Sequence, residues 1–268
     1  MHSNTPSTNS LCKLFELVAA LRHPVNGCQW DIKQSFNTIA PHIIEEAYEV
    51  ADTIEQNDMN ALKEELGDVL FQIVFNVQLA REKKLFSFED VVNTVYKKMI
   101  SRHPHIFSKN TSLLTCFEDI DWEEQKAEER KVRHEDAGAL FGVALALPAL
   151  MRAQKLQQRA AMMGFDWPNM KHVFDKIQEE IVELKAEVDK KNSSSIEEEL
   201  GDLLFSCVNL ARHLGLDAEL ALRRGNEKFI NRFNQVEERF SKENKSMKEA
   251  SLEQLEEVWS SVKKDSSI

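Results

Sequence analysis

The chain has 268 residues, of which 42% are hydrophobic and 29% charged, and only 8 Gly and 6 Pro interrupt it, which favours long amphipathic helices over a turn-rich β fold. The formal net charge of −11 argues against a broad nucleic-acid surface, because phosphate backbones are bound mainly through clustered Lys and Arg. We therefore expect an all-α protein without a nucleic-acid partner, and the length suits two domains.

The first ten residues, rich in Ser, Thr, Asn and Pro, are typical of a frayed terminus. We expect one domain over residues 11–130, a linker over 131–150 that packs on one of the domains, and a second domain over 151–268. The longest apolar run, 137–151, contains Pro148 and is shorter than the roughly 20 residues that cross a bilayer, so no membrane partner is expected.

The cysteines are scattered, without a C-x-x-C pair, and the N-terminus does not resemble a secretory signal. A disulfide framework or a zinc site is thus not indicated for Cys12, Cys28, Cys116 and Cys207. We expect a protein of the reducing cytoplasm.

An acidic sequence motif occurs twice. The first half contains E-E-A-Y-E and then E-E-L-G-D, and the second half contains E-E-I-V-E and then E-E-L-G-D. Four of these carboxylates recur 134 positions later: Glu46, Glu49, Glu65 and Asp68 correspond to Glu180, Glu183, Glu199 and Asp202. The spacing indicates an internal duplication, with each repeat longer than a hundred residues.

Each set predicts an antiparallel helical hairpin. Carboxylates three residues apart share a helix face, and the two pairs of each half are symmetric about residue 57 or residue 191. Asn57-Asp58 and the segment 192–195 supply turn and N-cap residues, and Ser194 with Glu197, or Ser195 with Glu198, predicts a capping box. Gly67 and Gly201 are expected to allow close helix approach.

Four carboxylates at one level repel one another unless a cation lies between them, and all-oxygen ligands suit Mg²⁺, or Mn²⁺, rather than zinc. The competing interpretation is a solvated acidic face, which the repeated spacing disfavours. A di-iron bundle is disfavoured because no His in the chain follows a Glu by three residues.

Together with G-C-Q-W-D at 27–31, R-H-P-H at 102–105, L-P-A-L at 147–150, G-F-D-W at 164–167 and N-E-K-F at 226–229, these motifs resemble the MazG family over nearly the whole chain. The resemblance implies a nucleoside triphosphate pyrophosphohydrolase, which converts a triphosphate and water to the monophosphate and pyrophosphate. It also implies two tandem helical domains, four-helix bundles completed by homodimerisation, metal on the carboxylates and a fairly base-tolerant pocket that serves nucleotide-pool control.

Several residues of the second half are candidates for chemistry. The metal ligands are Glu180, Glu183, Glu199 and Asp202, and the lower-ranked set is Glu46, Glu49, Glu65 and Asp68. Glu179 or Glu198 is the candidate base that activates water, and each is equally compatible with a solvent-facing position. Lys176 either grips a phosphate or forms an ion pair with Glu180.

Further candidates lie near the C-terminus. Lys228 and Arg232 share a helix face with Asn226 just before them, so they are candidates for phosphate or sugar contacts, or for a solvated surface. Trp259 either stacks on a base, with Lys263 at a phosphate, or anchors the last helix. Trp30 and Trp167 lie in turns, and the His103-Pro104-His105 text favours a helix-ending turn over a metal pair.

The second half is the expected active site, because the first half has His42 in place of Lys176 and Tyr96 in place of Asn226. The alternative of another class is an acidic helical scaffold or regulatory dimer. Within enzymes, the alternatives are an all-α dUTPase or a phosphoribosyl-ATP pyrophosphohydrolase. A kinase or motor is disfavoured because the chain lacks a Walker A loop.

Overall fold

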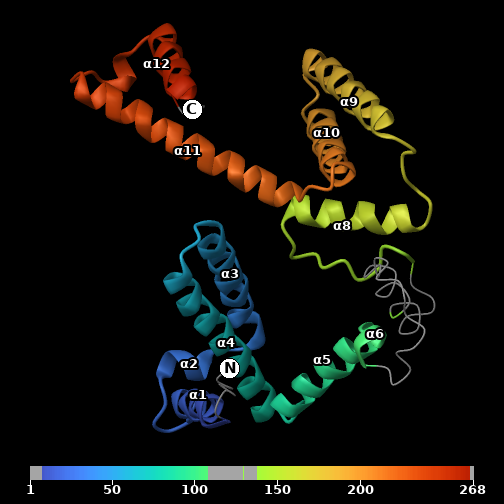
Figure 1. Cartoon of the computed structure of the whole chain (residues 1–268), viewed down its shortest axis with the longest axis vertical. Coiled ribbons are helices and arrows are strands. Elements are labelled where there is room, and N and C mark those ends of the chain that lie inside the picture. Colours follow the sequence, from blue (N-terminus) through green and yellow to red (C-terminus); the bar gives the residue numbers. More distant parts are fainter. Residues whose placement is uncertain (1–7, 108–128, 130–137, 266–268) are drawn as a thin grey trace. The chain divides into compact units, whose positions relative to one another are not determined.

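The computed structural model describes residues 8–107, 129 and 138–265, and the regular structure in these ranges is helical throughout. The predicted all-α fold is thereby confirmed. The chain divides between residues 120 and 121 into two compact units, each of which is described by itself (Figure 1). The finer boundaries 11–130, 131–150 and 151–268 stay predictions. No helix in the described ranges is both long enough and apolar enough to span a bilayer.

The first unit is built around the hairpin of its two longest helices (Figure 1). Its helices are α1 (Thr8–Leu21), α2 (Gln29–Lys33), α3 (Phe36–Glu55), α4 (Met59–Glu82), α5 (Phe88–Arg102) and α6 (Pro104–Phe107). Helix α1 packs on α4, and the fully buried core comprises Val18, Ile39, Val74, Phe75 and Leu79.

The turn between α3 and α4 lies where the carboxylate symmetry predicts it. Asn57 adopts the left-handed conformation with φ of 57°, which Asn tolerates better than most residues. The Asp58 carboxylate then accepts hydrogen bonds from the N–H groups of Asn60 and Ala61, both at 3.0 Å, and so caps α4.

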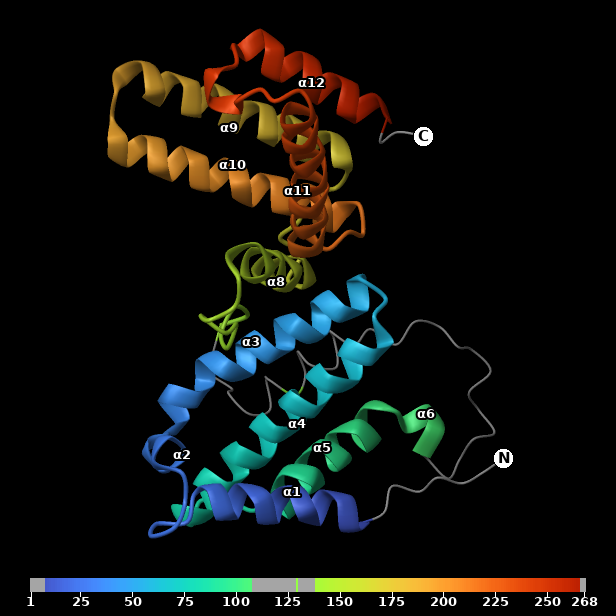
Figure 2. The ribbon, with the colours of Figure 1, turned by 90° about the vertical axis from the view of Figure 1, so that its left-hand side faces the viewer.

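The second unit repeats the hairpin with α9 and α10, which Figure 2 shows running side by side. Its helices are α8 (Ala149–Met162), α9 (Met170–Lys190), α10 (Ser193–His213), α11 (Ala218–Lys242) and α12 (Leu252–Asp265), with a 3₁₀ turn at Met247–Glu249. Helix α8 packs on α10 and α11, whereas α12 packs on α11.

The second turn also lies where it was predicted, but its cap differs. Lys191 is left-handed with φ of 57°, and α10 begins at Ser193 with Asn192 as its N-cap. The predicted capping box is therefore wrong, because both serines lie inside the first turn of the helix. Asn192 instead donates to the Ser195 hydroxyl at 2.7 Å.

Two further expectations concern single motifs. His103 ends α5 and Pro104 begins α6, so the His-Pro-His text is a helix-ending turn as predicted. The expected close approach of helices at Gly67 and Gly201 is absent, because a Cβ built at either glycine meets nothing within 4 Å. Both glycines face open space beside the exposed apolar residues Leu66 and Leu200.

The segment before α8 contacts its own unit. The guanidinium of Arg159 on α8 donates to the Phe141 carbonyl, and Leu140 lines a cavity of the second unit. The part of the predicted linker that the structure describes thus packs on the second unit.

Candidate active site

Three of the four predicted carboxylates of the second unit converge. Glu180 on α9 and Glu199 and Asp202 on α10 each place one oxygen within 4.8 Å of the other two. Glu180 is buried with 3% of its surface exposed, whereas Asp202 is exposed. The fourth residue, Glu183, is exposed and outside this trio, although its charge still acts on Glu199.

The first unit holds a corresponding trio. One oxygen each of Glu46, Glu49 and Glu65 lies within 4.8 Å of the others, and Asp68 is exposed outside the trio. The two hairpins therefore gather three carboxylates each, but they omit different members of the repeated set.

The carboxylates repel one another in both units. Burial, followed by the charges of Glu183, Glu180 and Asp202, raises the pKa of Glu199. Burial, followed by the charges of Asp68 and Glu49, likewise raises the pKa of Glu46. A cation would relieve this repulsion, and carboxylate oxygens are the donors that hard divalent ions prefer, so the clusters fit a metal ion.

Lys176 is tied to this cluster. Its ammonium lies 2.8 Å from a Glu179 oxygen and 2.7 Å from a Glu180 oxygen, and these hydrogen bonds raise the pKa of Lys176 above its ordinary value. The ion pair with Glu180, one of the two predicted roles, is therefore present. In the first unit the corresponding His42 lies 3.4 Å from Glu45.

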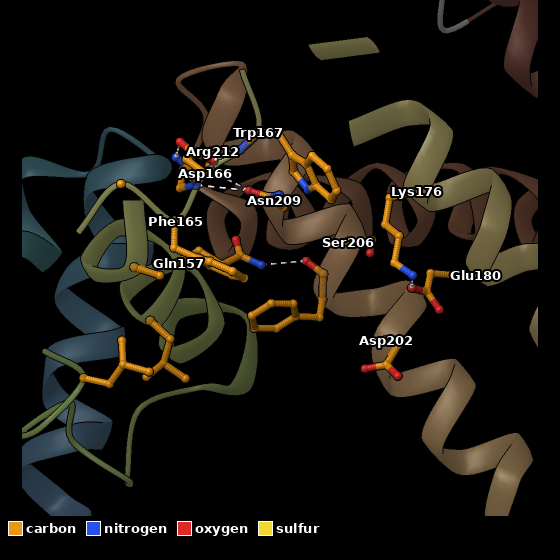
Figure 3. Close-up of a pocket in the computed structure, with 15 residues that line it drawn as sticks. Gln157, Phe165, Asp166, Trp167, Lys176, Glu180, Asp202, Ser206, Asn209 and Arg212 are labelled. Carbon is orange, nitrogen blue, oxygen red and sulfur yellow. Dashed lines mark hydrogen bonds and ion pairs between the residues drawn. The ribbon is translucent and has the colours of Figure 1, made fainter. Parts of the chain in front are cut away.

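A cavity of about 680 Å³ opens beside the trio of the second unit. In Figure 3, Lys176, Glu180 and Asp202 lie at one end, Gln157 and Phe165 lie at the other, and Ser206 lies between them. Its walls come from the segment before α8, from α8, from the α8–α9 connection, and from α9 and α10. A volume of this size accommodates a small organic ligand.

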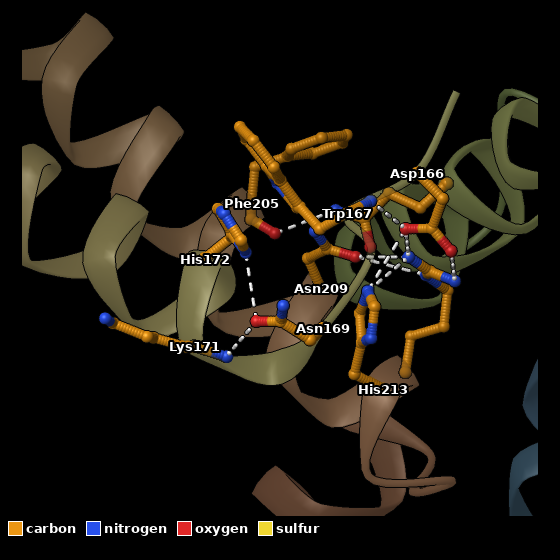
Figure 4. A network of polar contacts seen from close by, with 10 residues as sticks. Asp166, Trp167, Asn169, Lys171, His172, Phe205, Asn209 and His213 are labelled. Atoms are coloured by element: carbon orange, nitrogen blue, oxygen red, sulfur yellow. Dashed lines mark hydrogen bonds and ion pairs between the residues drawn. The ribbon is translucent and has the colours of Figure 1, made fainter. Parts of the chain in front are cut away.

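A polar network holds the connection that forms one wall (Figure 4). Arg212 donates to both oxygens of Asp166, with Nη1 to Oδ2 at 2.9 Å, and these bonds hold the pKa of Asp166 below its ordinary value. The Asp166 carboxylate also accepts from the Trp167 N–H at 2.8 Å. The Trp167 ring stacks on His172 with centroids 5.9 Å apart, so its place at the cavity is fixed from two sides.

The comparisons with known proteins agree with this geometry. The family model of the MazG nucleotide pyrophosphohydrolase domain matches residues 34–107 and 169–237, which contain both carboxylate hairpins. The chain belongs to the MazG family. This confirms the predicted family and the expectation of an enzyme of the hydrolase class.

The relatives that match almost end to end include two enzymes from different bacteria. A nucleoside triphosphate pyrophosphohydrolase of Escherichia coli strain K12 is 45% identical over 96% of this chain and 98% of its own length. The nucleoside triphosphate pyrophosphohydrolase/pyrophosphatase MazG of Thermotoga maritima is 40% identical over 94% of each chain. The chain also matches half of the uncharacterized protein YabN of Bacillus subtilis, at 35% identity.

The C-terminal candidates of this MazG chain do not line the cavity. Asn226 and Lys228 are exposed on α11, and Arg232 is half-buried. Trp259 packs in the cluster of α11 and α12 around Val236, Phe240 and Val262, and its ring lies 5.5 Å from that of Phe229. Trp259 therefore anchors the last helix within the described chain, and Lys263 is exposed on the same helix.

The two candidate bases lie in different surroundings. Both Glu179 and Glu198 are exposed, on α9 and α10 respectively. Glu179 is paired with Lys176. Of the two tryptophans in turns, Trp167 lines the cavity, and Trp30 lies 6.0 Å from the His42 ring.

Sequence reasoning missed much of the cavity lining, including Gln157, Phe205, Ser206 and Asn209. One signal was available for Ser206, since it stands 134 positions after Gln72, where the repeat has changed a long side chain to a short one. In the first unit Gln72 is buried and hydrogen-bonds to the Glu46 carboxylate.

Proposed function

We propose that the second unit hydrolyses nucleoside triphosphates to the monophosphate and pyrophosphate with Mg²⁺, or Mn²⁺, and with broad base tolerance in control of the nucleotide pool. The observation that carries this proposal is the cavity that opens beside Glu180, Asp202 and Lys176. The names of the two full-length relatives support the reaction.

Glu180, Glu199 and Asp202, with Glu183 at the rim, would hold the metal ion. When bound, a divalent ion supplies charge neutralisation for the polyphosphate and lowers the pKa of a bound water. Lys176 keeps the carboxylates oriented and presents a positive charge at the phosphate end of the cavity. Its pairing with Glu179 lowers that residue's availability as a base, and Glu198 then becomes the better candidate for accepting the proton of water.

The first unit would have a structural rather than a catalytic role. It has His42 where the second has Lys176, and Gln72 occupies the place of Ser206. Nevertheless, it keeps three clustered carboxylates and is expected to bind a metal ion weakly.

A homodimer would complete the four-helix bundles. The α9–α10 hairpin leaves Val182, Leu200 and Leu204 about half exposed, at 58%, 45% and 50%, around the open space at Gly201. Burying such a face against a second hairpin is the usual source of bundle stability. In a dimer that brings α11 of one copy to the hairpin of another, Asn226, Lys228 and Arg232 would reach the phosphates. The same arrangement would bring Trp259 and Lys263, on α12, near the bound substrate.

The test is product identity. The protein is incubated with each standard triphosphate and Mg²⁺, and the products are separated by chromatography. We expect monophosphate and pyrophosphate, with no turnover in excess EDTA. Diphosphate and orthophosphate as main products would refute the reaction, and metal binding without turnover would favour the acidic scaffold. We place the protein in the cytoplasm, where such substrates are made.

A further inference from the structure

The aromatic part of the cavity lining is suited to a flat ring. Phe165, Trp167 and Phe205 supply this aromatic surface, and Phe165 is 83% exposed. Aromatic faces stack on nucleobases of every kind, since each base has a π-face. Two amide side chains, Gln157 and Asn209, line the same cavity.

Gln157 presents a fixed acceptor. Its Nε2 donates to the Phe205 carbonyl at 2.8 Å, and a carbonyl only accepts, so the amide cannot be turned around. The residue is 7% exposed, and its Oε1 has no hydrogen-bond partner among the residues that the structure describes. A buried carbonyl oxygen without a donor is costly unless a donor arrives with a ligand.

Asn209 presents a fixed donor. Its Oδ1 accepts from Arg212 Nε at 3.1 Å and from Nη2 at 2.7 Å, and a guanidinium only donates. The amide is therefore oriented with Nδ2 as its remaining end. Arg212 is itself held by Asp166, so the orientation does not depend on a ligand.

We propose that Gln157 Oε1 and Asn209 Nδ2 read the Watson–Crick edge of the nucleobase, with Gln157 accepting from a base N–H and Asn209 donating to the acceptor beside it. This inference rests on the proposed function and names its specificity-determining residues.

One acceptor and one donor make the site tolerant. Adenine and cytosine offer an amino group beside a ring nitrogen, and guanine and uracil offer a ring N–H beside a carbonyl. Adenine, cytosine and uracil can thus satisfy both amides after a small shift in the plane of the ring. Guanine can do so once its ring is turned over, because its carbonyl lies on the other side of its N–H. A base whose edge N–H is replaced by a methyl group cannot, because Gln157 Oε1 then stays unpaired.

The experiment compares UTP with 3-methyluridine triphosphate, which lacks the N3–H. In the natural protein we expect kcat/KM for the methylated substrate to be lower by about tenfold or more, as for a lost buried hydrogen bond. In Gln157→Met, which keeps the side-chain volume but not the acceptor, the ratio of the two values should fall towards one.

The matched control is Gln158→Met, on the same helix but outside the cavity lining, which should keep the discrimination of the natural protein. Equal rates on both substrates in the natural protein would overturn the inference and leave the proposed function standing. Discrimination that survives in Gln157→Met would assign it to steric exclusion and also overturn the inference. No pyrophosphate from either substrate would overturn the proposed function itself.

A second variant covers the case in which Gln157→Met does not fold. Asn209→Asp keeps an oxygen for Arg212 but replaces the donor with an acceptor. We expect KM for UTP to rise about tenfold with a smaller change in kcat, because a base contact made equally in the ground and transition states acts on binding. An unchanged KM would overturn the role of Asn209.

Discussion

The repeated sequence permits the same substitution in both units of one molecule. We predict that Glu180→Gln nearly abolishes triphosphate hydrolysis, whereas Glu46→Gln leaves most of it. Both changes replace a carboxylate at the same repeat position with an amide of the same shape. Any difference in outcome therefore reports the surroundings rather than the substitution.

The magnitude follows from the burial and the partners of Glu180. Its carboxylate is 3% exposed, lies 2.7 Å from the Lys176 ammonium and belongs to the trio that would hold the metal. Removing one partner of a fully buried charge pair costs about 3–5 kcal/mol, and the lower end applies here because the Lys176 side chain is 34% exposed and partly screened by solvent. If about 3 kcal/mol falls on the transition state, the rate drops by roughly two powers of ten, since each 1.36 kcal/mol is about tenfold.

The assay is steady-state release of pyrophosphate with Mg²⁺, with circular dichroism and sedimentation run on both variants. A variant that has lost its helices or its oligomeric state is replaced by Asp202→Asn against Asp68→Asn, the second matched pair. If the first-unit variants lose as much activity as the second-unit ones while remaining folded and associated, the assignment of catalysis to the second unit is wrong.

Three other predictions follow from separate features. The protein should sediment as a homodimer at micromolar concentration, and a fully active monomer would contradict the bundle. Asp166→Asn should lower the free energy of unfolding at pH 7 by about 1 kcal/mol, because its ion pair with Arg212 is partly screened by solvent. The fold lowers the pKa of Asp166 from 3.8, so this stabilisation is present above pH 3.8 and is lost as the pH falls below it. Denaturant unfolding should therefore show a smaller difference in unfolding free energy between the natural protein and the variant at pH 3 than at pH 7. Ser206→Gln gives the second unit the residue that the first unit has at the corresponding position, Gln72. The longer side chain should narrow the cavity and raise KM for every triphosphate about tenfold or more without loss of helix content. Unchanged kinetics would place the substrate elsewhere.

The hairpins could be predicted because their signal is local. Two pairs of carboxylates symmetric about residues 57 and 191 fix where each chain reverses, and the turn residues agree with that position. The structure gathers three of the four predicted ligands of each set within mutual reach, and the spacing alone does not say which member is left out. In the second unit this member is Glu183, which is exposed although its charge acts on Glu199.

The cavity could not be predicted in the same way. Gln157, Trp167 and Asn209 come from α8, from a connection and from α10, and no spacing rule relates them. Trp259 illustrates the opposite case, since its sequence allowed either stacking on a base or anchoring a helix. Packing on Val236 and Phe240, which lie on another helix, is present in the described chain, and the stacking role stays a prediction.

The tight turns at Asn57 and Lys191 also bear on how the protein assembles. Each joins two helices whose contacting residues are near one another along the chain, so closing the hairpin costs little chain entropy. Such low contact order is associated with fast folding. Each hairpin can therefore form early and independently, with its carboxylates already gathered, before the flanking helices α1 and α8 dock and close the core around it.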